Sequence, residues 1–375
     1  MNRKPIASTS AALAAALAFA LTAAPLRAPA QTPAQAPAQT PSRPPAPAPI
    51  PGQPAPSDYV SAPTPVPTPP IDPFPSVNPK FFTAKSPTTQ TVSAFLHQIW
   101  GYDTNRLWKV MAIQNTPAPG VAKITVFITD KGPNAQIQSA DFFVTPDGKH
   151  AIGAGAGVVP FGAKPFEEAR DILRERANGA SRGAPAKDFE LVEFADLQCP
   201  HCKDAQGTMD QIVHDFPKAH VVFQLLPITD LHPSAFKAAA YGVCAQKISD
   251  DAFFKYAAGV FDTQDALSPT TDDTVLKGAA MRAGLDSAAI AACAATPATR
   301  DIVLADIKLG VDLDIQQTPT LMVNGRPLPI GGDLPYETLK QIIQYQATTD
   351  GVDSGATPET LAPKPEQPKL ETLPK

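Results

Sequence analysis

The chain has 375 residues, four cysteines, 44 prolines and a net charge of −5 at pH 7. The length allows two domains, but the proline content indicates that part of the chain forms no packed core. The modest charge, with no basic stripe, argues against nucleic acid as a partner.

The first 30 residues have the pattern of an export signal. Arg3 and Lys4 precede an apolar, alanine-rich run over residues 11–24, and the segment ends in the small-residue string A-P-A. The apolar run is shorter than the ~20 residues that a membrane-spanning helix needs. We therefore predict a signal peptide at residues 1–30 and a periplasmic or otherwise exported location.

Two further segments have the composition of unstructured chain. Residues 31–79 contain 18 of the 44 prolines and few side chains that a core could bury, which favours extended, polyproline-like conformations. Residues 349–375 are polar and also rich in proline. We predict that both segments are disordered and that the first is a semi-rigid linker.

Residues 80–182 are predicted to form a small α+β domain. A helix is expected over Thr91–Tyr102, where apolar residues recur at helical spacing, and a second over Pro165–Ala177, which has proline in its first turn. A linker is expected over Asn178–Lys187. The three or four antiparallel strands are expected at Leu107–Asn115, Lys123–Asp130, Ala140–Thr145 and around Ala151.

The strongest chemical signal follows the apolar strand that begins at residue 190. Cys199-Pro200-His201-Cys202 lies where this strand ends and a helix begins, a placement typical of a thioredoxin-like redox site. Unpaired N–H groups at a helix N-terminus favour a thiolate on the first cysteine. Pro200 pre-sets the first turn, and a protonated His201 adds positive charge. We predict that Cys199 attacks and that Cys202 resolves.

The alternatives for this cysteine pair are a structural disulfide and half of a zinc site. Zinc would need two more ligands at knuckle spacing, and the remaining cysteines stand alone at Cys244 and Cys293. We therefore expect neither a metal site nor a cofactor.

The remainder of this region alternates between strand and helix signals. A continuous apolar strand is expected at Ala219–Pro227, and an Asn-Gly turn should join strands at Thr320–Val323 and Arg326–Ile330 before a helix at Tyr336–Tyr345. Between these lie five helical segments. They cover Ser234–Gln246, Ala252–Phe261, Asp273–Ala283, Ser287–Ala294 and Thr299–Val311.

Two motifs carry a resemblance to a known family. The string E-F-x-x-x-x-C-P-H-C at residues 193–202 resembles the DsbA family of exported thiol oxidoreductases, and Q-T-P-T-L-M-V-N-G at residues 317–325 resembles the cis-proline strand of the thioredoxin superfamily. The resemblance implies an α/β, thioredoxin-like fold with an inserted helical block over residues 186–348, preceded by the small α+β domain.

The resemblance also implies roles for single residues. Glu193 matches a buried acid whose raised pKa lets it relay a proton to or from Cys202, although an exposed strand glutamate is the alternative. Asp196 is nearer the turn and is expected to be solvated.

Pro319 is expected to be cis, so that the backbone of Thr318 can pair with an extended substrate strand and bring its sulfur to Cys199. An ordinary trans proline is the alternative.

The remaining cysteines and histidines have no clear place in this chemistry. Cys244 and Cys293 fall in separate predicted helices, and two leftover thiols in an oxidising compartment usually form a structural disulfide; free buried thiols are the alternative. His214, His220 and His232 are expected to be surface or packing residues rather than ligands.

The order of a small α+β unit, a linking helix and a thioredoxin unit is similar to that of the DsbC and DsbG disulfide isomerases. The phrase FFVTPDGKHAIG at residues 142–153 resembles the hairpin that ends their first module. This resemblance implies a homodimer through residues 80–182; a substrate-binding or packing domain is the alternative.

The sequence therefore predicts an exported enzyme that oxidises or isomerises disulfides in other proteins. Its partners would be substrate proteins with thiols or disulfides and a membrane or soluble redox partner, without nucleic acid. The alternative is a thiol-based periplasmic chaperone or metal-handling binding protein without catalytic turnover. Oxidase and isomerase are not separated by the sequence.

Overall fold

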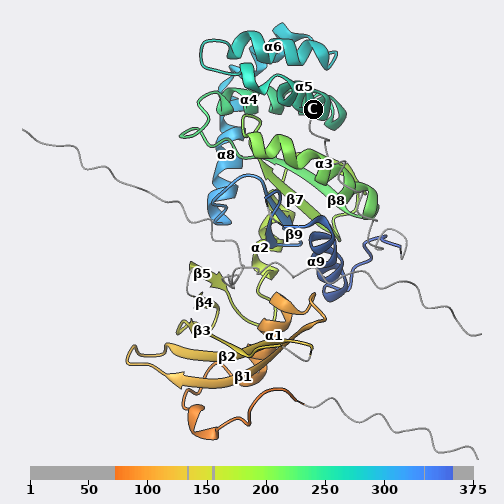
Figure 1. Ribbon diagram of the computed structural model, residues 1–375. Coiled ribbons are helices and arrows are strands. Elements are labelled where there is room, and N and C mark those ends of the chain that lie inside the picture. Colours follow the sequence, from red (N-terminus) through yellow and green to blue (C-terminus); the bar gives the residue numbers. More distant parts are fainter. Residues whose placement is uncertain (1–71, 133–134, 154–156, 333, 358–375) are drawn as a thin grey trace, which may run out of the picture. The chain divides into compact units, whose positions relative to one another are not determined.

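The computed structural model describes residues 72–132, 135–153, 157–332 and 334–357. The predicted signal peptide and residues 31–71 of the predicted spacer lie outside these ranges. The described residues from Val77 onward belong to one compact unit by their contacts. This unit contains two five-stranded sheets (Figure 1).

The first sheet is an antiparallel meander in which the strands follow one another in chain order. Its helix is α1 (Thr89–Trp100), which begins before the predicted Thr91 because the Thr88 hydroxyl accepts the Thr91 N–H and caps it. Val92 and Phe95 of this helix lie in one core with Ile124 of the sheet. The strands are β1 (Arg106–Asn115), β2 (Ala122–Asp130), β3 (Gln138–Val144), β4 (His150–Gly153) and β5 (Gly157–Pro160).

The second sheet has the order β10-β9-β7-β8-β6. Its two central strands, β7 and β8, are parallel, while β9 runs antiparallel to β7 and β6 antiparallel to β8. All six residues of each central strand are buried, as the continuous apolar run of β8 predicts. The strands are β6 (Ala180–Gly183), β7 (Glu190–Ala195), β8 (His220–Leu225), β9 (Thr320–Val323) and β10 (Arg326–Pro329).

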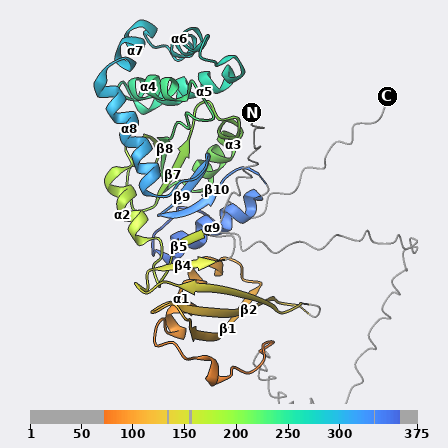
Figure 2. The same cartoon turned by 90° about the vertical axis from the view of Figure 1, so that its left-hand side faces the viewer.

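Alternating residues of the second sheet face two helical layers, which lie on its opposite sides in Figure 2. Leu191, Val221 and Leu321 pack against α3 (Pro200–Asp215) and α9 (Tyr336–Thr349). Val192, Val222 and Met322 pack against α2 (Glu167–Arg176) and α8 (Pro297–Asp312). The face to which a β7 residue points therefore decides which helix its side chain meets.

The hairpin between β9 and β10 turns at Asn324-Gly325, as the sequence predicts. Both residues have positive φ angles, 46° and 87°, which asparagine and glycine tolerate best. A Cβ atom on Gly325 would lie 2.3 Å from the Phe166 carbonyl oxygen. Glycine is therefore required at this position by both conformation and space.

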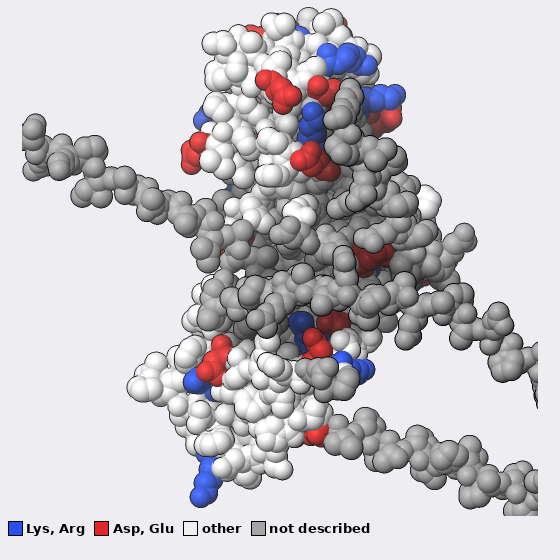
Figure 3. Space-filling view, in the orientation of Figure 1, with Lys and Arg blue, Asp and Glu red and all other residues white. Residues whose placement is uncertain are grey.

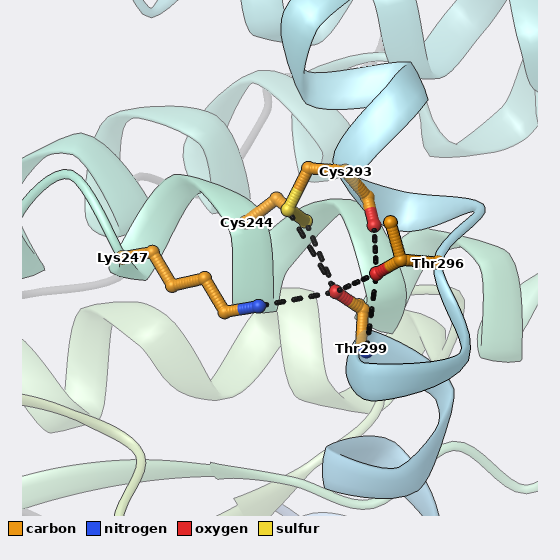
Figure 4. Close-up of a disulfide and its surroundings, with 5 residues drawn as sticks. All are labelled: Cys244, Lys247, Cys293, Thr296 and Thr299. Atoms are coloured by element: carbon orange, nitrogen blue, oxygen red, sulfur yellow. Dashed lines mark hydrogen bonds between the residues drawn. A yellow bond between two sulfur atoms is a disulfide. The ribbon is translucent and has the colours of Figure 1, made fainter.

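Five helices lie between β8 and β9 and form the inserted helical block. The disulfide between Cys244 and Cys293 joins the first and fourth of them (Figure 4). It closes a loop of 49 residues, a constraint that stabilises a fold by about 4 kcal/mol in the chain-entropy account. The helices are α4 (Ala235–Gln246), α5 (Asp250–Asp262), α6 (Asp272–Arg282), α7 (Ser287–Ala294) and α8.

Charged side chains of both signs are interspersed on the face of this block seen in Figure 3. Lys237 of α4 pairs with Asp272 and Asp273 at 2.7 and 2.6 Å. Partly exposed pairs of this kind contribute little to stability. They show that the block presents a mixed rather than a single-sign surface at this place.

The predicted linker over Asn178–Lys187 is wrong. Residues 180–183 form β6, the edge of the second sheet, so the predicted boundary of the first domain at residue 182 also cuts through a strand. The segment has one buried alanine and no apolar alternation, so its strand conformation depends on pairing with β8. Strand β5 was also missed, and its strand conformation comes from antiparallel pairing with β4.

The two segments predicted to be disordered, residues 31–79 and 349–375, each include residues that are ordered in the structure. Asn78 accepts the Lys80 N–H and caps the 3-10 turn Pro79–Phe81. At the other end, α9 continues to Thr349, and the buried Ser354 accepts the Lys218 N–H through its carbonyl. Residues 358–375 lie outside the described part of the chain.

Candidate functional site

Strand β7 and helix α3 place the two motif cysteines at the end of the sheet. Cys199 is the N-cap of α3 and Pro200 its first residue, so Cys202 lies in the first turn. Both cysteines are free thiols. Cys199 is 4% exposed and Cys202 is fully buried, whereas Pro200 and His201 face solvent. The predicted attacking sulfur is therefore the more accessible one.

The surroundings of Cys199 favour its thiolate. The Cys202 thiol donates a hydrogen bond to the Cys199 sulfur, and this bond outweighs the opposing effect of burial. The backbone N–H groups of Cys202 and His201 point at the same sulfur, as expected at a helix N-terminus whose cap has no oxygen. A hydrogen bond from the Thr318 side chain adds to these donors, and together they lower the pKa of Cys199 to about 5.

Cys202 has the opposite environment. Its burial strongly raises the pKa of its thiol, and the hydrogen bond that it donates to Cys199 adds to the effect. The backbone N–H of Asp196 donates to the Cys202 sulfur at 3.4 Å. The two sulfurs are thus held in different protonation states at neutral pH.

Glu193 lies on β7 and is 1% exposed, so it is not an exposed strand glutamate. Gln206 of α3 donates to its Oε1 at 2.9 Å and to the Cys202 carbonyl at 3.0 Å. Burial raises the pKa of Glu193 to about 7, although the bond from Gln206 opposes this shift. An acid with this pKa can both hold and release a proton near neutral pH.

The Thr318–Pro319 peptide is cis and lies against the dithiol. The Cys199 thiol contacts the Thr318 carbonyl oxygen at 3.6 Å. Pro319 is buried and Thr318 is half-buried just before β9. The backbone of Thr318 is therefore next to the Cys199 sulfur.

The expected solvation of Asp196 is wrong. Its side chain is fully buried, and its carboxylate accepts the N–H groups of Gln198 and Ile228 and a hydrogen bond from His232. The bond to Gln198 is an Asx turn, for which the residue type was a usable signal. The other two donors come from more than 30 positions away, where no local pattern could indicate them.

Two glutamines that hold the loop before Cys199 were also missed. Gln264 donates to the carbonyls of Leu197 and Cys199, each at 3.0 Å. Gln198 accepts the Ser234 N–H at 2.8 Å and donates to the Leu267 carbonyl at 3.1 Å. Gln264 and Leu267 lie within the inserted helical block, and Ser234 lies at its start. The insertion therefore helps to shape the loop before Cys199.

His220 and His214 have the packing and surface roles expected of them. His220 bonds to the Ala184 carbonyl through Nδ1 at 2.7 Å, and the largely exposed His214 pairs with Asp215. Within the described residues, no group of three or more histidine, cysteine or acidic side chains could hold a metal ion.

Comparison with known proteins relates part of this chain to the thioredoxin family. Residues 175–345 match the family model described as thioredoxin. The chain is 29% identical over 175 residues to the Na(+)/H(+) antiporter NhaA 3 of Salinispora tropica and 30% identical over 177 residues to NhaA 1 of Salinispora arenicola. These matches cover 47% of this chain and 24% of each antiporter, so the chain spans about a quarter of the length of these relatives.

The described part of the chain has no single helix that is long and apolar enough to cross a membrane. The bent pair α7 and α8 passes a test of length and composition alone.

Solved structures that resemble this domain include the following three. A thioredoxin-like oxidoreductase from Silicibacter pomeroyi is 21% identical, with a TM-score of 0.41 over 48% of this chain and 98% of that one. The catalytic domain of Proteus mirabilis ScsC is 21% identical, with a TM-score of 0.40 over 49% of this chain and 99% of that one. Wolbachia pipientis α-DsbA1 is 21% identical, with a TM-score of 0.41 over 48% of this chain and 97% of that one.

The family match covers β7, the Cys-Pro-His-Cys helix, the inserted helices and the cis-proline strand. This chain therefore carries, over residues 175–345, a domain that matches the thioredoxin family model.

Proposed function

We propose that this domain catalyses thiol–disulfide exchange with other exported proteins. The observation that carries the proposal is the pairing of a low-pKa thiol at Cys199 with a buried, protonated thiol at Cys202, next to the Thr318 carbonyl. A thiolate is the nucleophile and the leaving group in such exchange. The site thus has an entry sulfur and a resolving sulfur.

In one direction the Cys199 thiolate attacks a substrate disulfide. A bond forms between Cys199 and one substrate sulfur, and the other substrate sulfur leaves as a thiolate. Cys202 then loses its proton and attacks Cys199, which releases the second substrate sulfur and leaves the Cys199–Cys202 disulfide. In the other direction a substrate thiolate attacks Cys199 of that disulfide, so the same site supports oxidation or, in repeated cycles, isomerisation.

Glu193 is proposed as the proton acceptor and donor for Cys202. Its side chain lies on the α3 side of β7 and shares Gln206 with the Cys202 carbonyl. A proton leaving a buried thiol needs a nearby base because water does not reach it. A carboxyl whose pKa is about 7 can take the proton and return it later.

The wider setting of the enzyme is also part of the proposal. An exported location follows from the pattern of residues 1–30, and substrate proteins would dock an extended strand beside Thr318. A redox partner must reset the dithiol. The homodimer through residues 80–182 stays a prediction, and general interchange is proposed without a choice between oxidase and isomerase.

The first prediction concerns the thiolate. In the reduced protein, thiolate absorbance and the rate of alkylation by iodoacetamide should rise with pH around a midpoint near 5, because the donors at Cys199 lower its pKa to about 5. The Cys199→Ser variant should lose this transition. A midpoint near the ~8.5 of a free cysteine would contradict the proposed nucleophile.

The second prediction concerns Glu193→Gln, measured on the oxidised protein so that no active-site thiol titrates. A carboxyl whose folded pKa is raised stabilises the fold below its unfolded pKa and loses that contribution as the pH rises through the folded pKa. Because the pKa of Glu193 rises from 4.5 to about 7 on folding, the free energy of unfolding of the wild-type protein should fall by up to about 3 kcal/mol as the pH rises through this range. The variant should lack this loss in denaturant unfolding and be the more stable protein above pH 7.

The same variant should slow the Cys202 step of exchange tenfold or more at pH 7, because its amide cannot accept the proton. Equal pH dependence of stability in both proteins, together with unchanged exchange, would exclude Glu193 as a buried titrating acid.

The third prediction tests the function itself with the full chain. Wild type should reduce insulin or reactivate scrambled ribonuclease, and Cys199→Ser should lower either activity at least a hundredfold because the nucleophile is lost. His214→Ala, at an exposed position of α3, is the matched control and should stay within twofold. Full activity in Cys199→Ser would favour the binding-protein alternative.

A further inference from the structure

The backbone of Asp196 contacts both cysteines of the redox site. Its N–H donates to the Cys202 sulfur at 3.4 Å, and its carbonyl accepts the Cys199 N–H at 3.0 Å. Asp196 lies directly after β7, where the sheet ends and the loop to α3 begins (Figure 1). The orientation of this one residue therefore fixes a hydrogen-bond donor at the resolving sulfur.

The carboxylate of Asp196 sets that orientation. Oδ1 accepts the Gln198 N–H at 2.7 Å, and Oδ2 accepts the Ile228 N–H and the Nδ1 hydrogen of His232, both at 2.8 Å. A buried carboxylate is expensive unless such donors satisfy it. Because an ionised carboxylate has no proton to donate, the Nδ1 atom of His232 must carry the hydrogen.

His232 is the one side chain among these three donors, and it is placed to act from outside the loop. It lies between β8 and α4 and is 18% exposed, while Asp196 has no exposed side-chain area. The Ile228 carbonyl accepts the His232 N–H at 2.9 Å, which closes this segment on itself. Asp196 is thus clamped from its own loop on one side and from the segment after β8 on the other.

We propose that Asp196 and His232 are positioning residues for the resolving step of exchange. The inference rests on the proposed function. In the mixed disulfide, the Cys202 thiol gives its proton to Glu193 and its thiolate attacks the Cys199 sulfur. The Cys199–Cys202 bond forms, the bond from Cys199 to the substrate breaks, and the substrate sulfur leaves as a thiolate that takes a proton from water.

Negative charge must appear at the Cys202 sulfur before that attack, in a site where burial opposes it. The Asp196 N–H is a donor aimed at this sulfur in advance. The Asp196 carboxylate would itself oppose a second nearby negative charge, and its three donors compensate for this. Loss of His232 would remove one donor and free the carboxylate to turn, so that the N–H no longer points at Cys202.

The test follows the reaction of the reduced full-length protein with oxidised glutathione by rapid quenching and mass analysis. This separates formation of the Cys199 mixed disulfide from its resolution by Cys202. His232→Ala and Asp196→Asn should slow resolution tenfold or more while changing mixed-disulfide formation less than threefold. His232→Asn, whose amide nitrogen takes the place of Nδ1, should restore resolution to within threefold of wild type.

Two matched controls lie at exposed positions. Asp230→Asn changes an acid on the same segment as His232, and His214→Ala removes a histidine from α3; both should keep each rate within twofold.

An unchanged rate of mixed-disulfide resolution in His232→Ala would overturn the proposal. Equal slowing of mixed-disulfide formation and resolution would also overturn it, because the Asp196–His232 hydrogen bond would then only maintain the loop. If Asp196→Asn does not fold, the comparison of His232→Ala with His232→Asn decides. Failure of the proposed function looks different, because wild type would then form no mixed disulfide at all.

Discussion

A charged sulfur can persist at the nearly buried Cys199 because hydrogen-bond donors converge on it. One is the thiol of Cys202, two are backbone N–H groups of the first turn of α3, and the side chain of Thr318 adds a further one. The donors from α3 reach the sulfur only because β7 ends where it does and α3 begins directly after Cys199. The parallel pairing of β7 with β8 and the packing of α3 on the sheet thus serve, first of all, to aim one helix N-terminus at one sulfur.

The same donors bias the redox equilibrium. Each pKa unit corresponds to about 1.4 kcal/mol, and 1.4 kcal/mol to about 30 mV for a two-electron couple. Lowering the Cys199 pKa from 9.0 to about 5 would therefore move the potential by on the order of 100 mV towards the oxidising side. Stabilising the thiolate makes the reduced form easier to reach, so the disulfide becomes a better oxidant.

The sequence predicted those parts of the site whose signals are local. The Cys-Pro-His-Cys spacing, the apolar run of β8 and the Asn-Gly turn each express a short-range physical rule, and the structure has the corresponding elements. The positions of Glu193 and of the cis Thr318–Pro319 peptide came from family resemblance. The structure buries the first and brings the second to Cys199.

The rest depends on contacts between distant segments. Strand β6 forms because β8 offers an edge, not because of its own residues. Asp196 is buried because donors at Ile228 and His232 reach it, and Gln264 caps carbonyls from 65 and 67 positions away. Polar residues that satisfy a buried loop leave no periodic pattern in a sequence, so a solvated acid and a clamped one look alike before the fold is known.

The central claim is that the surroundings of Cys199 hold it as a thiolate and thereby make the Cys199–Cys202 disulfide oxidising. The most direct measurement is the equilibrium of this pair with reduced and oxidised glutathione at pH 7, quantified by trapping free thiols. A potential above about −200 mV, between the values typical of glutaredoxins and of strong periplasmic oxidants, is predicted. A potential at or below about −270 mV, as in thioredoxin, would contradict the account.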